Sequence, residues 1–524
     1  MKSSLLQILL YLFSALFSLP THYAYISRSH FPNEFLFGVA TSSYQVEGAV
    51  LEDGRGFNTW DMFTHTHGKV LNGDTADVSD DHYHRHQEDI ELMDSLGINS
   101  YRFSISWTRI LPKGRFGDVN PKGIEFYSKL IDNLLEKGIE PFVTISHHDI
   151  PQELEDRYQS WLSPRVQDDF AYYADICFKN FGDRVKYWIT INEPNLFSTY
   201  AYHTGEYPPG RCSAPFGNCL SGNSETEPLI AVHNMILSHA KATQIYRKNY
   251  QKKQGGYITV VPNAGMYFPL SDNEADHEAA KRAIAFSAPW VLDPVIHGDY
   301  PPEMRRLLGD SLPKFSPEET KMVKNSVDFL GFNHYVTLYA KDCIHSSCDS
   351  GGHAIQGFAY IASERNGIPI GQPTAMRGFH IVPHGLEMLI EYLKIRYNNM
   401  PMFLLENGMG QANEPLALHN ELQQDIQRVH YHKSYLAAIQ RAMRNGADVR
   451  GYFIWSLIDN FEWVVGYSLR FGLYYVDFQT LNRSEKSSAK WYRDFLFNAT
   501  EKLDPQVIEM ITPKFPGTKI VSHS

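Results

Sequence analysis

The sequence predicts an α/β fold: a single (β/α)8 TIM barrel with extended loops at the C-terminal face of the barrel. Eight short runs of apolar or β-branched residues recur along the 524-residue chain, as expected of parallel strands that are buried on both faces. Amphipathic, helix-like segments separate the runs, and this alternation is typical of the fold. The predicted strands are residues 35–40, 100–105, 141–146, 187–192, 257–262, 327–335, 401–406 and 449–456.

The segments between the predicted strands carry helix signals. Residues 88–96 end before Gly97 and residues 123–137 end before Gly138, so each has a glycine where a chain commonly leaves a helix. Two long insertions, residues 204–223 and 343–370, interrupt the alternation. Loops at the C-terminal face of a barrel shape its cleft, so we expect the insertions on that face.

The N-terminus predicts export. Met1-Lys-Ser-Ser precedes a mostly apolar run from Leu5 to Leu19, which is the pattern of a secretory signal peptide. A membrane anchor is the alternative, but the run is short for a bilayer span. We therefore expect residues 1–24 to be a signal peptide and residues 25–524 to form one barrel domain that is not bound to a membrane.

Composition argues against several classes of partner. The formal net charge of −11 disfavours a nucleic-acid surface, which needs clustered positive charge. Of two histidine-rich segments, residues 82–86 alternate histidines, which could mimic a metal-binding strand, and residues 147–148 lack a third ligand at workable spacing. The first favours a solvated helix start and the second favours hydrogen-bonding residues. We expect no nucleic acid, no metal and no other cofactor.

The five cysteines fit an oxidising compartment. Four of them form two local pairs, each of which could close a small disulfide loop. The pairs are Cys212 with Cys219 and Cys343 with Cys348. Cys177 is left over in a helical stretch, where a buried apolar role is favoured over a nucleophile. Asn482-Arg-Ser and Asn498-Ala-Thr are glycosylation sequons if the chain is secreted.

Two glutamates stand at the downstream ends of predicted strands. Glu193 ends the segment Tyr187-Trp-Ile-Thr-Ile-Asn-Glu, and Glu406 ends Pro401-Met-Phe-Leu-Leu-Glu. A single glutamate at a strand end is commonly a helix cap or an ion-pair partner. Two of them on strands four and seven would meet at one face of the barrel, where buried carboxylates are costly unless they are used. Such a pair suits cleavage of a glycosidic bond by a proton donor and a nucleophile.

Further polar and aromatic residues follow other strands, in a pattern suited to sugar hydroxyls and to the apolar faces of sugar rings. They are Gln45, His147, Asn192, Asn333 and Tyr335. The segment from Trp455 to Phe471 adds Glu462 and Trp463. A Trp-rich core helix is the alternative for this segment, but Glu462 would be costly in a core.

Long segments resemble glycoside hydrolase family 1, the β-glucosidases. They include Thr-Ile-Asn-Glu193-Pro, Glu406-Asn-Gly, Ser43-Tyr-Gln-Val-Glu-Gly48 and Gly451-Tyr-Phe-Ile-Trp-Ser-Leu-Ile-Asp-Asn-Phe-Glu-Trp463. The resemblance extends from residue 31 to about residue 492. It implies a retaining hydrolysis of small β-glucosides, with Glu193 as acid/base and Glu406 as nucleophile. Glutamate at position 193, where the thioglucosidase branch of the family has Gln, argues against that branch.

The same resemblance implies roles for the surrounding residues. Trp455 would form the floor of the sugar site. Tyr335 would donate to the nucleophile, with Arg102 beside it and Asn333 in support. The residues expected to bind the sugar are Gln45, His147, Asn192, Tyr335, Trp455, Glu462, Trp463 and Phe471.

Within the family the chain is similar to the plant branch associated with monolignol glucosides such as coniferin and syringin. The similarity lies in residues 147–158, in Asn333-His-Tyr and in the spacing of Cys343 and Cys348. It implies secretion to the apoplast or cell wall and a role in lignification, with the vacuole as an alternative. The residues expected to contact the aglycone are His148, Phe197 and Phe379. An oligosaccharide-processing β-glucosidase, a transglucosidase and a catalytically weak sugar-binding barrel are the alternatives.

Overall fold

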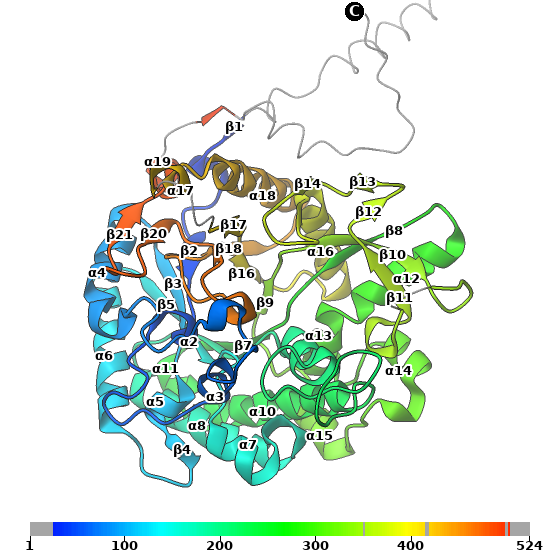
Figure 1. The fold of residues 1–524 in the computed structure, drawn as a ribbon, viewed down its shortest axis with the longest axis horizontal. Helices are drawn as coiled ribbons and strands as arrows, with labels where there is room; N and C mark the ends of the chain where they lie inside the picture. Colours follow the sequence, from blue (N-terminus) through cyan, green and yellow to red (C-terminus); the bar gives the residue numbers. More distant parts are fainter. Residues whose placement is uncertain (1–24, 349–351, 414–418, 498–500, 503–524) are drawn as a thin grey trace, which may run out of the picture.

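The computed structural model describes residues 25–348, 352–413, 419–497 and 501–502 (Figure 1). Eight parallel strands form its central sheet, in the order β7-β6-β5-β3-β2-β18-β16-β9. A parallel bridge between Asn263 and Asn333 joins the ends of β7 and β9, so the sheet closes on itself. The strands are β2 (Leu36–Ala40), β3 (Ser100–Ser104), β5 (Glu140–Ser146), β6 (Tyr187–Asn192), β7 (Tyr257–Val261), β9 (Leu330–Asn333), β16 (Met402–Asn407) and β18 (Val449–Trp455).

All eight predicted strands are confirmed, most within two residues of the predicted ends. Helices surround the barrel and cover the outer faces of its strands (Figure 1). The longer ones are α4 (His82–Leu96), α6 (Pro121–Glu136), α8 (Arg165–Phe181), α10 (Glu227–Asn249), α12 (Glu274–Ala285), α13 (Ala288–His297), α16 (Pro383–Arg396), α18 (Ile426–Arg444) and α19 (Ser487–Leu496). The predicted (β/α)8 fold is therefore confirmed.

Side chains fill the interior of the barrel, which is a packed core and not a pore. The interior cluster consists of Phe142, Ile189, Val261, Phe329, Phe403, Leu405 and Phe453. Leu405, which precedes Glu406, is fully buried there. A Cβ atom at Gly331 on the neighbouring strand β9 would come within 2.8 Å of the Leu405 side chain, so the glycine leaves the space that the leucine fills.

The predicted glycine helix ends are present. Gly97 ends α4 in the left-handed conformation with φ 75°, and Gly138 follows α6 with φ 72°. The prediction that residues 82–86 are a solvated helix start is correct for the start of α4 and wrong for its first two residues, His82 and Tyr83, which are buried. His82 is 3% exposed and its Nδ1 lies 2.8 Å from Asp89, because the ion pair of Asp89 with Arg483 brings the helix start into the protein.

The two insertions lie on the same side of the barrel as the strand ends. One is closed by the disulfide Cys212–Cys219 and the other by Cys343–Cys348. The second insertion contributes to a three-stranded sheet of β8 (Met266–Pro269), β10 (Thr337–Asp342) and β11 (Ala359–Ala362), against which α12 packs. Cys177 is fully buried in α8.

Some predictions concern residues outside the described ranges. The signal peptide, residues 1–24, and the sequon at Asn498 are among them. Asn482 is exposed between β20 (Tyr474–Val476) and β21 (Arg483–Glu485). Within the described ranges, the search for a helix of bilayer-spanning length and apolarity finds none.

Candidate active site

Glu193 and Glu406 line one cavity of about 1060 Å³ at the C-terminal ends of the strands. Glu193 directly follows β6 and precedes α9 (Pro194–Ser198) with a left-handed backbone of φ 44°, which is costly for a residue other than glycine. Its N–H donates to the carbonyl of Val261 (2.6 Å). Glu406 lies within β16. The side chains are 5% and 4% exposed, so water reaches both only through the cavity.

Neutral amides surround the carboxyl group of Glu193. Its Oε1 accepts hydrogen bonds from Nδ2 of Asn263 (2.9 Å) and from Nδ2 of Asn333 (3.0 Å). Burial and the nearby charge of Glu406 raise the pKa of Glu193 to about 7. This carboxyl group can therefore keep a proton near neutral pH.

Glu406 has charged and phenolic partners instead. Arg102 Nη1 lies 2.6 Å from its Oε1, and the hydroxyl of Tyr335 donates to its Oε2 (2.8 Å). Burial raises the pKa of Glu406, and the Arg102 guanidinium and the Tyr335 hydrogen bond oppose that rise. The two glutamates thus differ in kind: a cation stabilises the ionised form of Glu406, whereas no cation contacts Glu193 among the described residues.

His147 also lines the cavity. Its Nε2 lies 3.1 Å from Nδ2 of Asn192, and because an amide NH2 only donates, Nε2 accepts and Nδ1 carries the hydrogen. Burial holds the pKa of His147 well below its usual value, so the ring is neutral. Nδ1 has no partner within the described part of the protein.

The segment after β18 forms a further part of the cavity wall. Four of its predicted residues line the cavity: Trp455, Glu462, Trp463 and Phe471. Gln45 supports this segment from behind, since its Nε2 donates to the carbonyl of Phe461 (2.8 Å). Burial, followed by the charges of Glu406 and Glu193, raises the pKa of Glu462 to about 8. After Trp455, which ends β18, the segment is a loop with one short 3-10 helix, η8 (Trp463–Val465), and one two-residue strand, β19 (Leu469–Arg470), and not a core helix.

The other predicted residues divide into two groups. Tyr335, His148 and Phe379 also line the cavity. Five predicted residues lie behind its wall: Gln45, Arg102, Asn192, Asn333 and Phe197. The first four reach the cavity only through hydrogen bonds to neighbouring side chains. Phe197 differs from its predicted place in the wall, because it is 2% exposed and stacks on His148 at a centroid distance of 5.0 Å.

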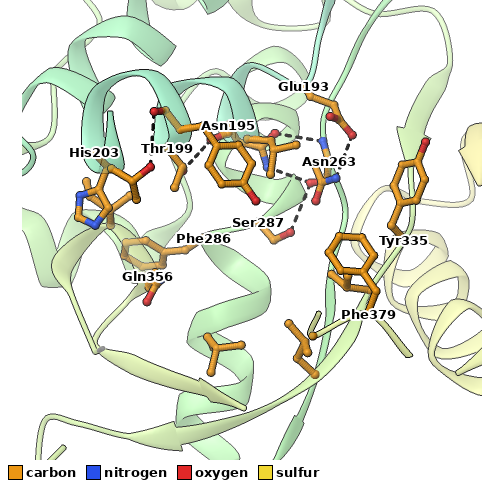
Figure 2. Close-up of a pocket in the computed structure, with 18 of the residues that line it drawn as sticks. Glu193, Asn195, Thr199, His203, Asn263, Phe286, Ser287, Tyr335, Gln356 and Phe379 are labelled. Atoms are coloured by element: carbon orange, nitrogen blue, oxygen red, sulfur yellow. Dashed lines mark hydrogen bonds between the residues drawn. The ribbon is translucent and has the colours of Figure 1, made fainter. Parts of the chain in front are cut away.

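Several lining residues were missed by sequence reasoning (Figure 2). Asn263 directly follows the fifth predicted strand, so the rule that found the other strand-end residues would have found it. The outer wall has no such pattern. It consists of residues from helices and insertions, among them Thr199, Tyr200, His203, Phe286, Ser287 and Gln356.

The geometry, two unlike carboxylates in a polar and aromatic cavity, agrees with comparisons to known proteins. Residues 27–501 match the model of glycosyl hydrolase family 1. The chain belongs to glycosyl hydrolase family 1. Its family relatives and structural neighbours include β-glucosidases, so the protein is a glycosidase.

Plant proteins are among the relatives that this family 1 glycosidase resembles. It is 53% identical over 472 residues to probable inactive β-glucosidase 14 of Oryza sativa subsp. japonica, covering 90% of this chain and 92% of the relative. It is 48% identical to the coniferin β-glucosidase of Pinus contorta, covering 93% and 95% of the two chains. The rice Os3BGlu6 β-glucosidase has a similar structure, with a TM-score of 0.87 and 45% identity over 90% of this chain and 99% of that one.

Proposed function

We propose that this glycosidase is a retaining β-glucosidase in which Glu193 is the acid/base and Glu406 the nucleophile. The observation that supports this assignment best is the difference between their partners. Arg102 lies 2.6 Å from Glu406, whereas Glu193 has two amide donors and a pKa of about 7. A nucleophile must be ionised and a general acid must be protonated, so the surroundings suit these two roles.

In the first step, an oxygen of Glu406 forms a bond to the anomeric carbon as the bond from that carbon to the aglycone oxygen breaks. Glu193 gives its proton to the departing oxygen, which leaves as an alcohol or phenol. Arg102 and Tyr335 hold Glu406 in place for the attack. The product of this step is a covalent glucosyl ester of Glu406.

In the second step, Glu193 acts as a base. The negative charge of Glu406 is one cause of the raised pKa of Glu193, and this charge is absent from the ester. The pKa of Glu193 therefore falls once the ester forms, and the ionised carboxylate can take a proton from water. The hydroxyl oxygen then bonds to the anomeric carbon, the ester bond breaks, and glucose leaves with its configuration retained.

We further propose that the aglycones are phenolic and include monolignols. The outer cavity is lined by the flat side chains of His148, Tyr200, Phe286 and Phe379, which suit an aromatic ring. The 48% identity to the coniferin β-glucosidase of Pinus contorta supports the same substrate class. Export through the predicted signal peptide and a role in cell-wall lignification are part of this proposal.

A catalytically weak sugar-binding barrel is the second candidate, because the relative with 53% identity is named a probable inactive β-glucosidase. Both glutamates and their hydrogen-bond partners are in place here, which favours the enzyme. A transglucosidase would use the same two carboxylates, with an acceptor alcohol in place of water. Processing of oligosaccharides would place a sugar where the phenolic ring is proposed.

The test is a comparison of kcat/KM on coniferin, syringin, cellobiose and an aryl β-glucoside, with and without an added alcohol acceptor. We expect turnover of all aryl glucosides and the highest kcat/KM for coniferin or syringin. A preference for cellobiose would replace phenolic aglycones with oligosaccharides, and alkyl glucosides as main products would identify a transglucosidase. Glucose binding without any turnover would overturn the proposed activity.

A further inference from the structure

The two carboxylate oxygens of Glu193 have different surroundings. Oε1 accepts both amide hydrogen bonds, from Asn263 at 2.9 Å and from Asn333 at 3.0 Å. No described group donates to Oε2, although Glu193 lines the cavity. Oε2 is therefore the oxygen that is available to a substrate.

This asymmetry determines which oxygen can hold the proton. A carbonyl-type oxygen accepts two hydrogen bonds, whereas an oxygen that carries a proton has less acceptor capacity left. A proton on Oε1 would leave one amide N–H without its acceptor in a buried site, which is costly. The proton of the neutral carboxyl group is accordingly favoured on Oε2.

The contact with Arg102 fixes the orientation of the Asn333 side-chain amide. Its Oδ1 lies 3.3 Å from Nη1 of Arg102, and a guanidinium only donates, so Nδ2 must be the atom that faces Glu193. Asn333 also donates to Asn192. Its orientation is thus part of the network that holds the nucleophile.

Asn263 is held separately, through its backbone (Figure 2). Asn195, two residues beyond Glu193, accepts from the N–H of Asn263 (3.0 Å) and donates to its carbonyl (2.9 Å). The hydroxyl of Ser287 donates to the same carbonyl (3.4 Å). Asn263 is therefore fixed relative to the turn that carries Glu193.

We propose that Asn263 is a positioning residue that places the transferable proton of Glu193 on Oε2. The proposal rests on the proposed role of Glu193 as acid/base. In the first step the proton passes from Oε2 to the aglycone oxygen as its bond to the anomeric carbon breaks. In the second step Oε2 takes a proton from the attacking water. Asn263 needs no contact with the substrate for this role.

The test is the dependence of kcat/KM, which reports the first step, on the leaving group. Asn263→Leu keeps the approximate volume and removes the donor, and Asn263→Gln retains an amide donor. For Asn263→Leu we expect kcat/KM on phenyl β-glucoside to fall about tenfold, the equivalent of one lost hydrogen bond. We expect little change on 2,4-dinitrophenyl β-glucoside, whose leaving group needs no proton, and partial recovery in Asn263→Gln.

Two comparisons separate positioning from simple binding. In a Glu193→Gln background, Asn263→Leu should add no further dependence on the leaving group. Asn273→Ala is the matched control, because Asn273 caps α12 outside the cavity and its loss affects only the fold. Melting temperatures of all variants show whether a loss of activity reflects a loss of folded protein.

Two other outcomes would overturn the proposal. Equal losses of kcat/KM on both substrates, or a KM increase that persists in the Glu193→Gln background, would make Asn263 a ligand-binding residue. A failure of the proposed function can be distinguished from a failure of this proposal. If Glu193 is not the acid/base, Glu193→Gln alone should lower activity on both substrates to the same extent.

Discussion

At the scale of single residues, the side chains that contact Glu193 and Glu406 distinguish the two glutamates better than their positions in the barrel do. Glu193 follows a strand of the barrel and Glu406 lies near the end of another, and both are buried, so burial alone raises the pKa of each. The difference arises from Arg102, a fully buried cation that contacts only one of them among the described residues. A buried guanidinium that lost this carboxylate would be strongly destabilising, which ties the charge of Glu406 to the stability of the barrel centre.

Replacement of the nucleophile gives the sharpest test at this scale. Glu406→Gly removes the attacking oxygen, so we expect kcat on an aryl β-glucoside to fall about a thousandfold or more. Azide fits the space left by the side chain and should restore part of the activity, with a product of inverted configuration. The product is identified by NMR of the glucosyl azide. Turnover like that of the wild type would remove Glu406 from the mechanism.

How much of the site can be predicted from the sequence depends on how each residue is placed. Residues at strand ends are predictable, because the carboxyl ends of all eight strands meet at one face. Glu193, His147 and Trp455 are of this kind. Whether a residue touches the cavity or supports it from behind depends on side-chain packing, as with Phe197, and no pattern in the sequence reports that packing.

At the scale of elements, an ion-pair cluster holds the segment after β18 against the barrel. Asp459 lies 2.7 Å from Arg470 and 2.6 Å from Lys486, and all three are buried. The segment between Asp459 and Arg470 contains Glu462 and Trp463, which line the cavity. The position of this part of the cavity wall thus depends on charges that are outside the cavity.

We expect Lys486→Met to destabilise the protein by about 3 kcal/mol, because it leaves part of the charge of Asp459 uncompensated in a buried site. KM for glucosides should rise as Glu462 and Trp463 lose their support. The matched control is Lys490→Met within α19, the helix that directly follows Lys486, where the exposed pair with Asp494 contributes little. Thermal melting and kinetics measure both effects. Equal behaviour of the two variants would contradict a supporting role for the cluster.

The barrel strands could be predicted from the sequence, whereas the elements outside the barrel could not. The eight strands were predictable from apolar runs because both of their faces are buried. The sheet of β8, β10 and β11 was not predicted, since its strands are half-buried and all three lie outside the eight-stranded barrel repeat. The outer cavity wall belongs to such elements, which is why its residues were missed.

At the scale of the whole molecule, the site lowers the stability of the fold at neutral pH. Asp149 accepts a hydrogen bond from the N–H of His147 behind the cavity (3.2 Å). The folded protein raises the pKa values of Asp149 and Glu193 to about 7 and that of Glu462 to about 8, mainly by burial. A carboxyl group whose pKa is raised by folding binds its proton more tightly in the folded state. Its contribution to stability is complete below the unfolded pKa of about 4 and is lost as the pH rises through the folded pKa.

This linkage predicts the effect of Glu193→Gln on stability. Gln cannot ionise, so the variant avoids the cost of a buried charge, which for a shift of this size is on the order of a few kcal/mol above pH 7. The melting temperature of the variant should therefore exceed that of the wild type at pH 8, and the difference should shrink as the pH falls toward 5. Calorimetry of both proteins from pH 5 to 8 measures it. A difference that is constant with pH would mean that Glu193 keeps an ordinary pKa in the folded protein, and that its fitness as an acid arises from the substrate complex alone.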